Sequence, residues 1–318
     1  MFRIQIQSKK KCIWYCSAAV SFLLFLLLNL WCDHLVNMQD AQQMAGRWSE
    51  KKDVAQISCF FSSKAEVTED TIQSFEYSLK NVLQEASITE TSENPGARLW
   101  VDAYSADGKI TLVNGRNKLD ANAIGIGGDF FLFHPLKLIT GSYFSGNDLM
   151  QDYCIIDQDA AWQLFGSNDV VGMTVYIGNV PHIVTGVVRR PQGRMEKAAG
   201  LTSTVVYVSY ETLETYGTSN GINHYEIVMP NPVDGFAYGK VKEGIGIDEK
   251  NVEIVENSRR YSLPNRMKTV LAFGTRSMNG KAIIYPYWEN LARGYEDIIA
   301  LLTVFMLLLS LYPVVTVI

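Results

Sequence analysis

Long apolar stretches lie near both ends of the chain, and shorter apolar segments alternate with polar ones between them. The first stretch, Cys12 to Cys32, contains 21 residues without a charge, and the second, Ile298 to Ile318, is equally long. A helix rises about 1.5 Å per residue, so each stretch matches the roughly 30 Å hydrocarbon core of a bilayer. The pattern predicts transmembrane helices over 12–32 and 298–318. They flank a main domain with a helical stalk over 33–297, and residues 1–11 precede the first helix.

A cleaved signal peptide is the alternative interpretation of the first stretch. Its apolar part is longer than the usual length of about 7–15 residues, and no cleavage site of small residues follows it. We therefore expect the first helix to remain in the protein.

The segments between the two stretches predict strands and helices in mixed order. "DVAQISCFFSS" is rich in strand-forming residues, whereas "TEDTIQSFEYSLKNVLQEAS" has the helical period, with Thr68 as the expected N-cap. The predicted buried face of this helix consists of Ile72, Phe75, Leu79, Val82 and Leu83.

Turn and cap residues divide the rest of the domain. "ARLWVDAYS" and "ITLVNG" resemble the two strands of a hairpin with Asp107-Gly108 at its turn. "IDQDAAWQLFG" predicts a helix that Asp157 or Asp159 caps and that ends at Gly166, and two strands around "GNVP" follow. The predicted fold class is α+β, a mixed sheet with packed helices between two transmembrane helices.

The stretch "AIGIGGDFFLFHPLKLITGSYF" resembles a glycine-rich phosphate loop at first sight. A P-loop needs Lys and Ser/Thr after its last glycine, and a dinucleotide fingerprint needs a third glycine that opens a helix. Here Asp129 and a run of phenylalanines follow Gly128. We therefore interpret the glycines as structural turns rather than as a nucleotide site.

Basic residues precede the first apolar stretch, and acidic residues follow it. Arg3 and Lys9 to Lys11 lie before Cys12, whereas Asp33 and Asp40 lie after Cys32. The positive-inside rule then predicts a cytoplasmic N-terminus, a two-pass topology and an extracytoplasmic main domain. The net charge is −5 and no basic stripe is present, so we expect the bilayer, and not nucleic acid, as a partner.

The sequence offers no pattern that is typical of catalysis, of a cofactor or of a metal site. His34, His134, His182 and His224 are isolated in sequence, which argues against a zinc site. Cys59 and Cys154, outside the apolar stretches, are expected to be buried free thiols or to form a single disulfide. We predict that the protein is not an enzyme.

Three segments in a fixed order carry a family resemblance. They are "IGGDFFLFHPLKLITGSYFSGNDL", "CIIDQDAAWQLFGSNDVVGMTVYIGNVPHIVTGVV" and "TVVYVSYETL", within residues 122–213. This part of the chain resembles the extracytoplasmic core domain of MacB-type permeases, the FtsX-like family of ABC transporters. Ser142, Met173 and Ser209 stand where the family pattern usually has Arg, Lys and Pro. The resemblance implies a rigid core domain, whose structural turns would include Gly125, Gly128, Gly141, Gly166, Gly172 and Gly186.

The resemblance also implies partners and a location. The implied location is the plasma membrane of a bacterium. The implied partners are a cytoplasmic ABC ATPase and further permease subunits, and the chain could form a homodimer or a heterodimer. The family usually has four transmembrane helices, so we expect either a longer protein that continues after Ile318 or a reduced member.

The segment before the second apolar stretch is the candidate coupling region. It is rich in aromatic residues, which gather at membrane interfaces. Trp288, Arg293, Tyr295 and Glu296 are either an interfacial collar or contacts that couple the domain to a partner subunit. The leading hypothesis is a non-enzymatic component of an ABC transport system whose outer domain relays motion or recruits a partner. The alternative is a membrane-anchored binding or sensor module without an ATPase.

Overall fold

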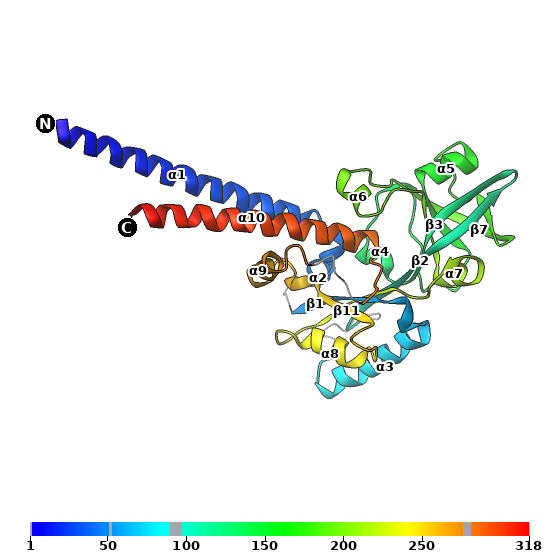
Figure 1. Cartoon of the computed structure of the whole chain (residues 1–318). Coiled ribbons are helices and arrows are strands. Elements are labelled where there is room, and N and C mark those ends of the chain that lie inside the picture. The colour runs from blue at the N-terminus through cyan, green and yellow to red at the C-terminus, as the bar shows by residue number, and fades with distance from the viewer. Residues whose placement is uncertain (1, 51–52, 90–96, 276–280, 318) are drawn as a thin grey trace. The chain divides into compact units, whose positions relative to one another are not determined.

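The computed structural model describes residues 2–50, 53–89, 97–275 and 281–317. The chain divides into two compact units. The helix unit comprises Met1–Gln39, Arg259–Met278 and Ala292–Ile318, and the domain unit comprises Asp40–Ser258 and Asn279–Leu291. Figure 1 shows the helices and strands of each unit.

A mixed sheet forms the centre of the domain unit and has 11 strands within the described ranges. Neighbouring strands are antiparallel except for two parallel pairs, β3 with β8 and β5 with β7. The main order is β11 (Val252–Glu256), β1 (Val54–Phe61), β10 (His224–Pro230), β2 (Val101–Asn114), β3 (Asn117–Gly128), β8 (Val205–Ser209), β5 (Tyr153–Asp157), β7 (Val180–Val188) and β4 (Leu138–Gly141). Two short strands, β6 (Thr174–Ile177) and β9 (Thr218–Ser219), pair beside β2. The predicted α+β class is confirmed.

Short helices connect the strands and cover the sheet. In the domain unit they are α2 (Met44–Trp48), α3 (Glu69–Glu85), α4 (Phe130–Phe133), α5 (Gln158–Phe165), α6 (Arg194–Ala198), α7 (Tyr210–Tyr216) and α8 (Phe236–Gly244). Three 3₁₀ turns, η1 (Asp40–Gln42), η2 (Ser63–Ala65) and η3 (Asn257–Arg259), add to these. The remaining helices are α1 (Phe2–Asn37), α9 (Leu263–Leu271) and α10 (Tyr287–Val317).

The two faces of the sheet bury different kinds of residue. One face packs against α3, α5, α7 and α8 in a large apolar cluster that includes Ile57, Tyr225 and Ile227. The other face packs against α2, α4 and Trp288 in a smaller cluster. Because side chains alternate along a strand, Gln56 and Glu226 lie on this second face, between apolar neighbours of the first cluster. Both polar side chains are buried there.

Local signals place the helices where the sequence predicts them. Thr68 caps α3, and Thr71 completes a reciprocal capping box. Asp157 accepts a hydrogen bond of 2.8 Å from the backbone N–H of Ala160 at the start of α5, and Gly166 ends that helix in a left-handed conformation. The predicted strands around "GNVP" are confirmed as β6 and β7.

The predicted turn at Asp107-Gly108 is wrong. Both residues lie inside β2, which pairs with β3 without interruption from Ala103 to Asn114. The turn lies instead at Gly115, whose φ of 58° fits a tight hairpin after Asn114. Glycine at position 108 allows the backbone of β9 to approach β2 closely, because an added Cβ would lie 2.4 Å from the backbone oxygen of Thr218.

Four of the six glycines that we predicted as turns lie in strands; Gly128 and Gly141 end their strands with a left-handed φ, but the other two lie in strand interiors. Gly125 lies within β3, and a Cβ there would lie 2.8 Å from the side chain of Leu213 in α7. Gly186 lies within β7, opposite Gly141 of β4, and a Cβ there would lie 2.9 Å from the backbone oxygen of Ser142. Both glycines therefore allow close packing and do not reverse the chain.

Two helices in the described part of the chain are long and apolar enough to cross a membrane. The qualifying segments are Ile13–Asn37 in α1 and Tyr287–Pro313 in α10, so the second helix begins before the predicted Ile298. Within the helix unit the two helices lie side by side (Figure 1) and pack around Cys32, Leu35 and Ile299. Ser21 donates a hydrogen bond of 2.9 Å to the backbone oxygen of Leu309.

Candidate functional site

The candidate coupling residues fall into both units. Trp288 belongs to the domain unit, whereas Arg293, Tyr295 and Glu296 belong to the helix unit. All four lie on α10, which begins at Tyr287 and continues past Leu291, where the domain unit ends.

Trp288 attaches the first turn of α10 to the sheet. Its side chain is buried in the second cluster, and its ring centroid lies 5.7 Å from that of Phe130 and 4.3 Å from that of His134. Asn290 adds a hydrogen bond of 3.2 Å to the backbone oxygen of Ala199. The segment by which the chain leaves the domain unit is thus packed into that unit.

A buried ion pair marks the corresponding stretch of the helix unit. Arg260 Nε lies 2.6 Å from Glu296 Oε1, and the exposed fractions of the two side chains are 2% and 13%. An ion pair that is shielded in this way depends on both partners, because either charge alone would be left poorly solvated. Tyr295 packs against the apolar cluster of the two long helices, and Arg293 is half-buried.

The second face of the sheet contains a buried group of polar residues, His134, His224 and Glu226, which we call the His–Glu cluster. His134 follows α4, and His224 and Glu226 lie two residues apart on β10, so they share one face of the strand. His134 Nε2 lies 2.6 Å and His224 Nε2 lies 3.0 Å from Glu226 Oε1. No side chain of the cluster is more than 3% exposed.

Neighbouring polar groups fix the members of the cluster. Gln56 Nε2 donates to Glu226 Oε2 at 3.0 Å, and Gln56 is itself held by the backbone N–H of Met44 at 2.9 Å. Ser105 Oγ lies 3.3 Å from His224 Nδ1. Met44 begins α2, and Trp288 lies in the first turn of α10. The cluster therefore lies beside both segments through which the chain enters and leaves the domain unit.

The electrostatics of the cluster favour an ionised Glu226 carboxylate. Burial alone would raise the pKa of Glu226, but His134 and His224 outweigh this and hold it well below its usual range. Burial lowers the pKa of His134, against the opposing attraction of Glu226. Neutral imidazole nitrogens and a carboxylate oxygen are the groups that bind transition metals in proteins.

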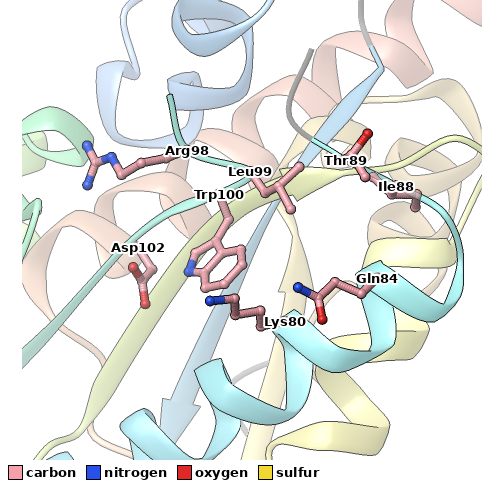
Figure 2. Close-up of a pocket in the computed structure, with 8 residues that line it drawn as sticks. All are labelled: Lys80, Gln84, Ile88, Thr89, Arg98, Leu99, Trp100 and Asp102. Atoms are coloured by element: carbon pink, nitrogen blue, oxygen red, sulfur yellow. The ribbon is translucent and has the colours of Figure 1, made fainter. Parts of the chain in front are cut away.

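An open groove lies on the other side of the domain unit, beside α3. Its volume is about 540 Å³, and Figure 2 shows Lys80 and Gln84 reaching from α3 towards Trp100. Asp102 lines the groove and accepts a hydrogen bond of 2.9 Å from Tyr225. The lining combines an indole, two cationic side chains and a carboxylate, which suits a polar or amphipathic ligand better than a purely apolar one.

Sequence reasoning missed the His–Glu cluster. The histidines are isolated in sequence, but the fold brings His134 and His224 to the same carboxylate. The signal available was the alternation His224-x-Glu226 in a predicted strand. The third member lies 92 positions from Glu226 in the chain, and no local pattern points to it. Cys59 and Cys154 are free and buried in separate strands.

Comparisons with known proteins identify relatives of the domain. The family model described as the MacB-like periplasmic core domain matches residues 38–254. A macrolide export ATP-binding/permease protein MacB of Chromobacterium violaceum is 31% identical over 130 residues, which are 40% of this chain and 19% of that protein. The MacB protein of Pasteurella multocida is 30% identical over 116 residues, 36% of this chain and 18% of that protein. The aligned part therefore spans about a fifth of these relatives.

Two solved structures align with much of the chain at low sequence identity. The periplasmic region of MacB from Actinobacillus actinomycetemcomitans aligns with 69% of this chain and 94% of its own, at 20% identity and a TM-score of 0.42. The extracellular domain of the noncanonic ABC-type transporter YknZ from Gram-positive bacteria aligns with 63% and 99%, at 19% identity and a TM-score of 0.42.

Proposed function

The chain belongs to the family of MacB-like periplasmic core domains, and on this basis we propose that it is a non-enzymatic membrane component of an ABC transport system. The observation that carries the proposal is the family match over 38–254 between two helices that are apolar enough to span a bilayer. The family is one of permease components and not of catalytic enzymes. The ATP-binding part would come from a separate domain or chain, since the sequence contains no G-x-x-x-x-G-K-[ST] motif.

In this proposal the domain unit lies outside the plasma membrane of a bacterium. Arg3 and Lys9 to Lys11 would hold the N-terminus in the cytoplasm, and α1 and α10 would cross the bilayer in opposite directions. The domain would then be placed where an exported compound or an outer partner could reach it, while the ATPase acts on the cytoplasmic side.

The first turn of α10 supports a mechanical role for the domain. The packing of Trp288 and the hydrogen bond from Asn290 attach this turn to the domain unit. The chain between Trp288 and Ile298 contains no Pro and a single glycine, Gly294, so it has little of the slack of a flexible linker. Movement of α10 would therefore be transmitted to the sheet, as a relay requires.

Association with an ABC ATPase tests the proposal. The full chain, with a tag, is purified in mild detergent from membranes of the bacterium that encodes it, after mild cross-linking. We expect recovery of an ABC ATPase and further permease subunits. A tagged two-pass membrane protein of another family, treated in parallel, controls for nonspecific recovery. Recovery of the chain without any ABC ATPase would contradict the proposal and favour a membrane-anchored module.

A growth assay addresses the transported compound separately. The curated relatives are named for macrolide export, so macrolides are the first class to test. We expect a strain without this chain to become at least several-fold more sensitive to an exported macrolide, and the full chain to restore resistance. Unchanged sensitivity together with ATPase association would exclude this substrate class and keep the transport role.

A further inference from the structure

We propose that the His–Glu cluster binds a divalent transition-metal ion, with Zn²⁺ as the best-fitting ion, through His134 Nε2, His224 Nε2 and Glu226 Oε1. The inference does not depend on the proposed transport role, because it concerns only the domain unit. The ion would join α4 to β10 beside α2 and the first turn of α10.

The three ligand atoms already converge. They all lie within 4.8 Å of one another, and each comes from a buried side chain. Zinc binds imidazole nitrogen and carboxylate oxygen at about 2.0–2.2 Å, so ligand atoms around a tetrahedral ion lie roughly 3.4 Å apart. His134 Nε2 and His224 Nε2 lie 2.6 and 3.0 Å from Glu226 Oε1, and small changes in side-chain torsion would lengthen both distances to this value.

The second layer of contacts is of the kind that orients metal ligands. Ser105 Oγ lies at Nδ1 of His224, which leaves Nε2 directed at Glu226. Gln56 binds the Oε2 atom of Glu226 and leaves Oε1 for the ion. Such outer partners set the ring orientation and the tautomer of ligating histidines.

One buried nitrogen of the cluster lacks a hydrogen bond. His224 Nε2 lies 3.0 Å from Glu226 Oε1, a contact that does not meet the geometry of a hydrogen bond. In the tautomer whose Nδ1–H donates to Ser105, Nε2 presents a lone pair to a carboxylate oxygen, and a cation between the two atoms would relieve the repulsion. In the other tautomer Ser105 donates to Nδ1 and Nε2–H faces Glu226, so the first tautomer is the one that fits a metal ligand.

Trp288 supplies a second unpartnered group beside the same site. Its ring centroid lies 4.3 Å from that of His134 and 5.3 Å from that of His224, and its buried Nε1 has no hydrogen-bond partner among the described residues. A water on the fourth position of the ion could accept from this indole N–H. Two imidazoles and one carboxylate favour Zn²⁺ and its neighbours over Ca²⁺ or Mg²⁺, which prefer all-oxygen sites.

The alternative is a metal-free ion pair, in which a protonated His134 neutralises Glu226. It accounts for the 2.6 Å contact, and the Nε2–H tautomer of His224 would face Glu226 Oε1 at 3.0 Å, but Trp288 Nε1 keeps no hydrogen-bond partner among the described residues. The two interpretations differ in metal content and in the response to chelators.

Metal binding by the full chain in detergent tests the proposal. After removal of metals with a chelator, Zn²⁺ is added back, and bound zinc is measured by mass spectrometry after gel filtration. We expect one ion per chain and a melting temperature that Zn²⁺ raises by several degrees and a chelator lowers again. Co²⁺ added to the same protein should give visible absorption bands without the intense bands of thiolate ligands.

Matched variants assign the site. Glu226→Gln and His224→Ala should each weaken Zn²⁺ binding at least tenfold. His182→Asn is the control, because His182 is also buried but bonds to Val180 and Thr212, outside the cluster, so its zinc content should equal that of the wild type. If either cluster variant fails to fold, the Co²⁺ spectrum of the wild-type chain decides whether the His–Glu cluster binds a metal. Absence of those bands, or equal zinc binding by the wild type and a folded cluster variant, would overturn the proposal.

Discussion

For single residues, backbone conformation and solvation decide which substitutions the fold tolerates. Gly141 has a φ of 85°, and an added Cβ would lie 2.1 Å from the backbone oxygen of Thr185 in the neighbouring strand. Glu76 and Asp102 are neighbouring, partly buried carboxyl groups, and burial raises the pKa of both. Each case gives a measurable expectation for stability.

Gly141→Val should destabilise the full chain by about 1–3 kcal/mol, because the change forces both a strained backbone and a clash between strands. Thermal melting in detergent measures the effect. Two controls separate the causes: Gly166→Ala has the same left-handed backbone but open space around it, and Gly239→Ala has neither problem. We expect a loss for the first that is smaller than that of Gly141→Val, and no loss for the second. An unchanged melting temperature for Gly141→Val would refute the assigned conformation.

Glu76 should make the domain less stable as pH rises. Burial, with Asp102 nearby, raises the pKa of Glu76 to about 8, whereas in the unfolded chain it is about 4.5. Between these values the folded state holds a proton that the unfolded state has released, so this contribution is full below pH 4.5 and is lost as pH approaches 8.

Glu76→Gln should flatten this pH dependence between pH 5 and about 8, as measured by melting temperature across buffers. Glu85→Gln, an exposed position on the same helix, is the control and should keep the wild-type profile. If the wild type and Glu76→Gln have parallel profiles, Glu76 is ionised in the folded state and the expectation fails.

At the scale of elements, α10 is the element on which the relay hypothesis depends. Its first turn is attached through Trp288, and its later residues pack with α1 around Ile299 within the helix unit. A helix transmits displacement only while its hydrogen bonds continue, so a local break should interrupt the relay without removing either unit.

A flexible Gly-Ser insert of seven residues between Leu291 and Ala292 should abolish transport, while membrane insertion and ATP hydrolysis by the partner continue. An Ala-rich helical insert of the same length is the matched control, since seven residues make nearly two full turns and preserve the faces of the helix. The same Gly-Ser insert at Gly115, in the tip of the β2–β3 hairpin, controls for insertion itself. Full transport with the flexible insert in α10 would exclude rigid transmission.

At the scale of the whole molecule, the two units imply different environments. The helix unit exposes large apolar side chains such as Phe22, Leu24 and Phe305, as a surface that faces lipid would. The domain unit has its apolar residues gathered in two buried clusters around one sheet. The topology we propose, with the domain outside and the N-terminus inside, follows from the charges on either side of the first apolar stretch, 12–32.

Cysteine labelling tests this topology. In a chain whose membrane cysteines, Cys12, Cys16 and Cys32, are replaced by serine, Asn220→Cys should react with an impermeant thiol reagent in intact cells with a permeable outer wall. Lys10→Cys should react only after the membrane is opened. Asn220 is suitable because it is exposed, and the remaining Cys59 and Cys154 are buried. The reverse pattern of labelling would invert the topology.

Features that depend on residues close together in the chain could be predicted from the sequence. The helical period and Thr68 placed α3, Asp157 and Gly166 placed α5, and two uncharged stretches predicted the long helices. The same local reasoning failed at Asp107-Gly108, because a turn-forming pair can continue a long strand when partners on both sides complete its hydrogen bonds. Turn propensity is a weak local preference, and strand pairing overrides it.

The candidate site depends on contacts between residues that are distant in the sequence. Gly125 and Gly186 were predicted as turns, but the closeness of Leu213 and of the backbone at Ser142, both distant in sequence from their glycine, explains why glycine is needed there. The His–Glu cluster depends on the register of β10 and on the position of α4, which bring His134 to a carboxylate 92 residues away. Contacts between distant residues follow from how the whole sheet is assembled, and no local pattern contains that information.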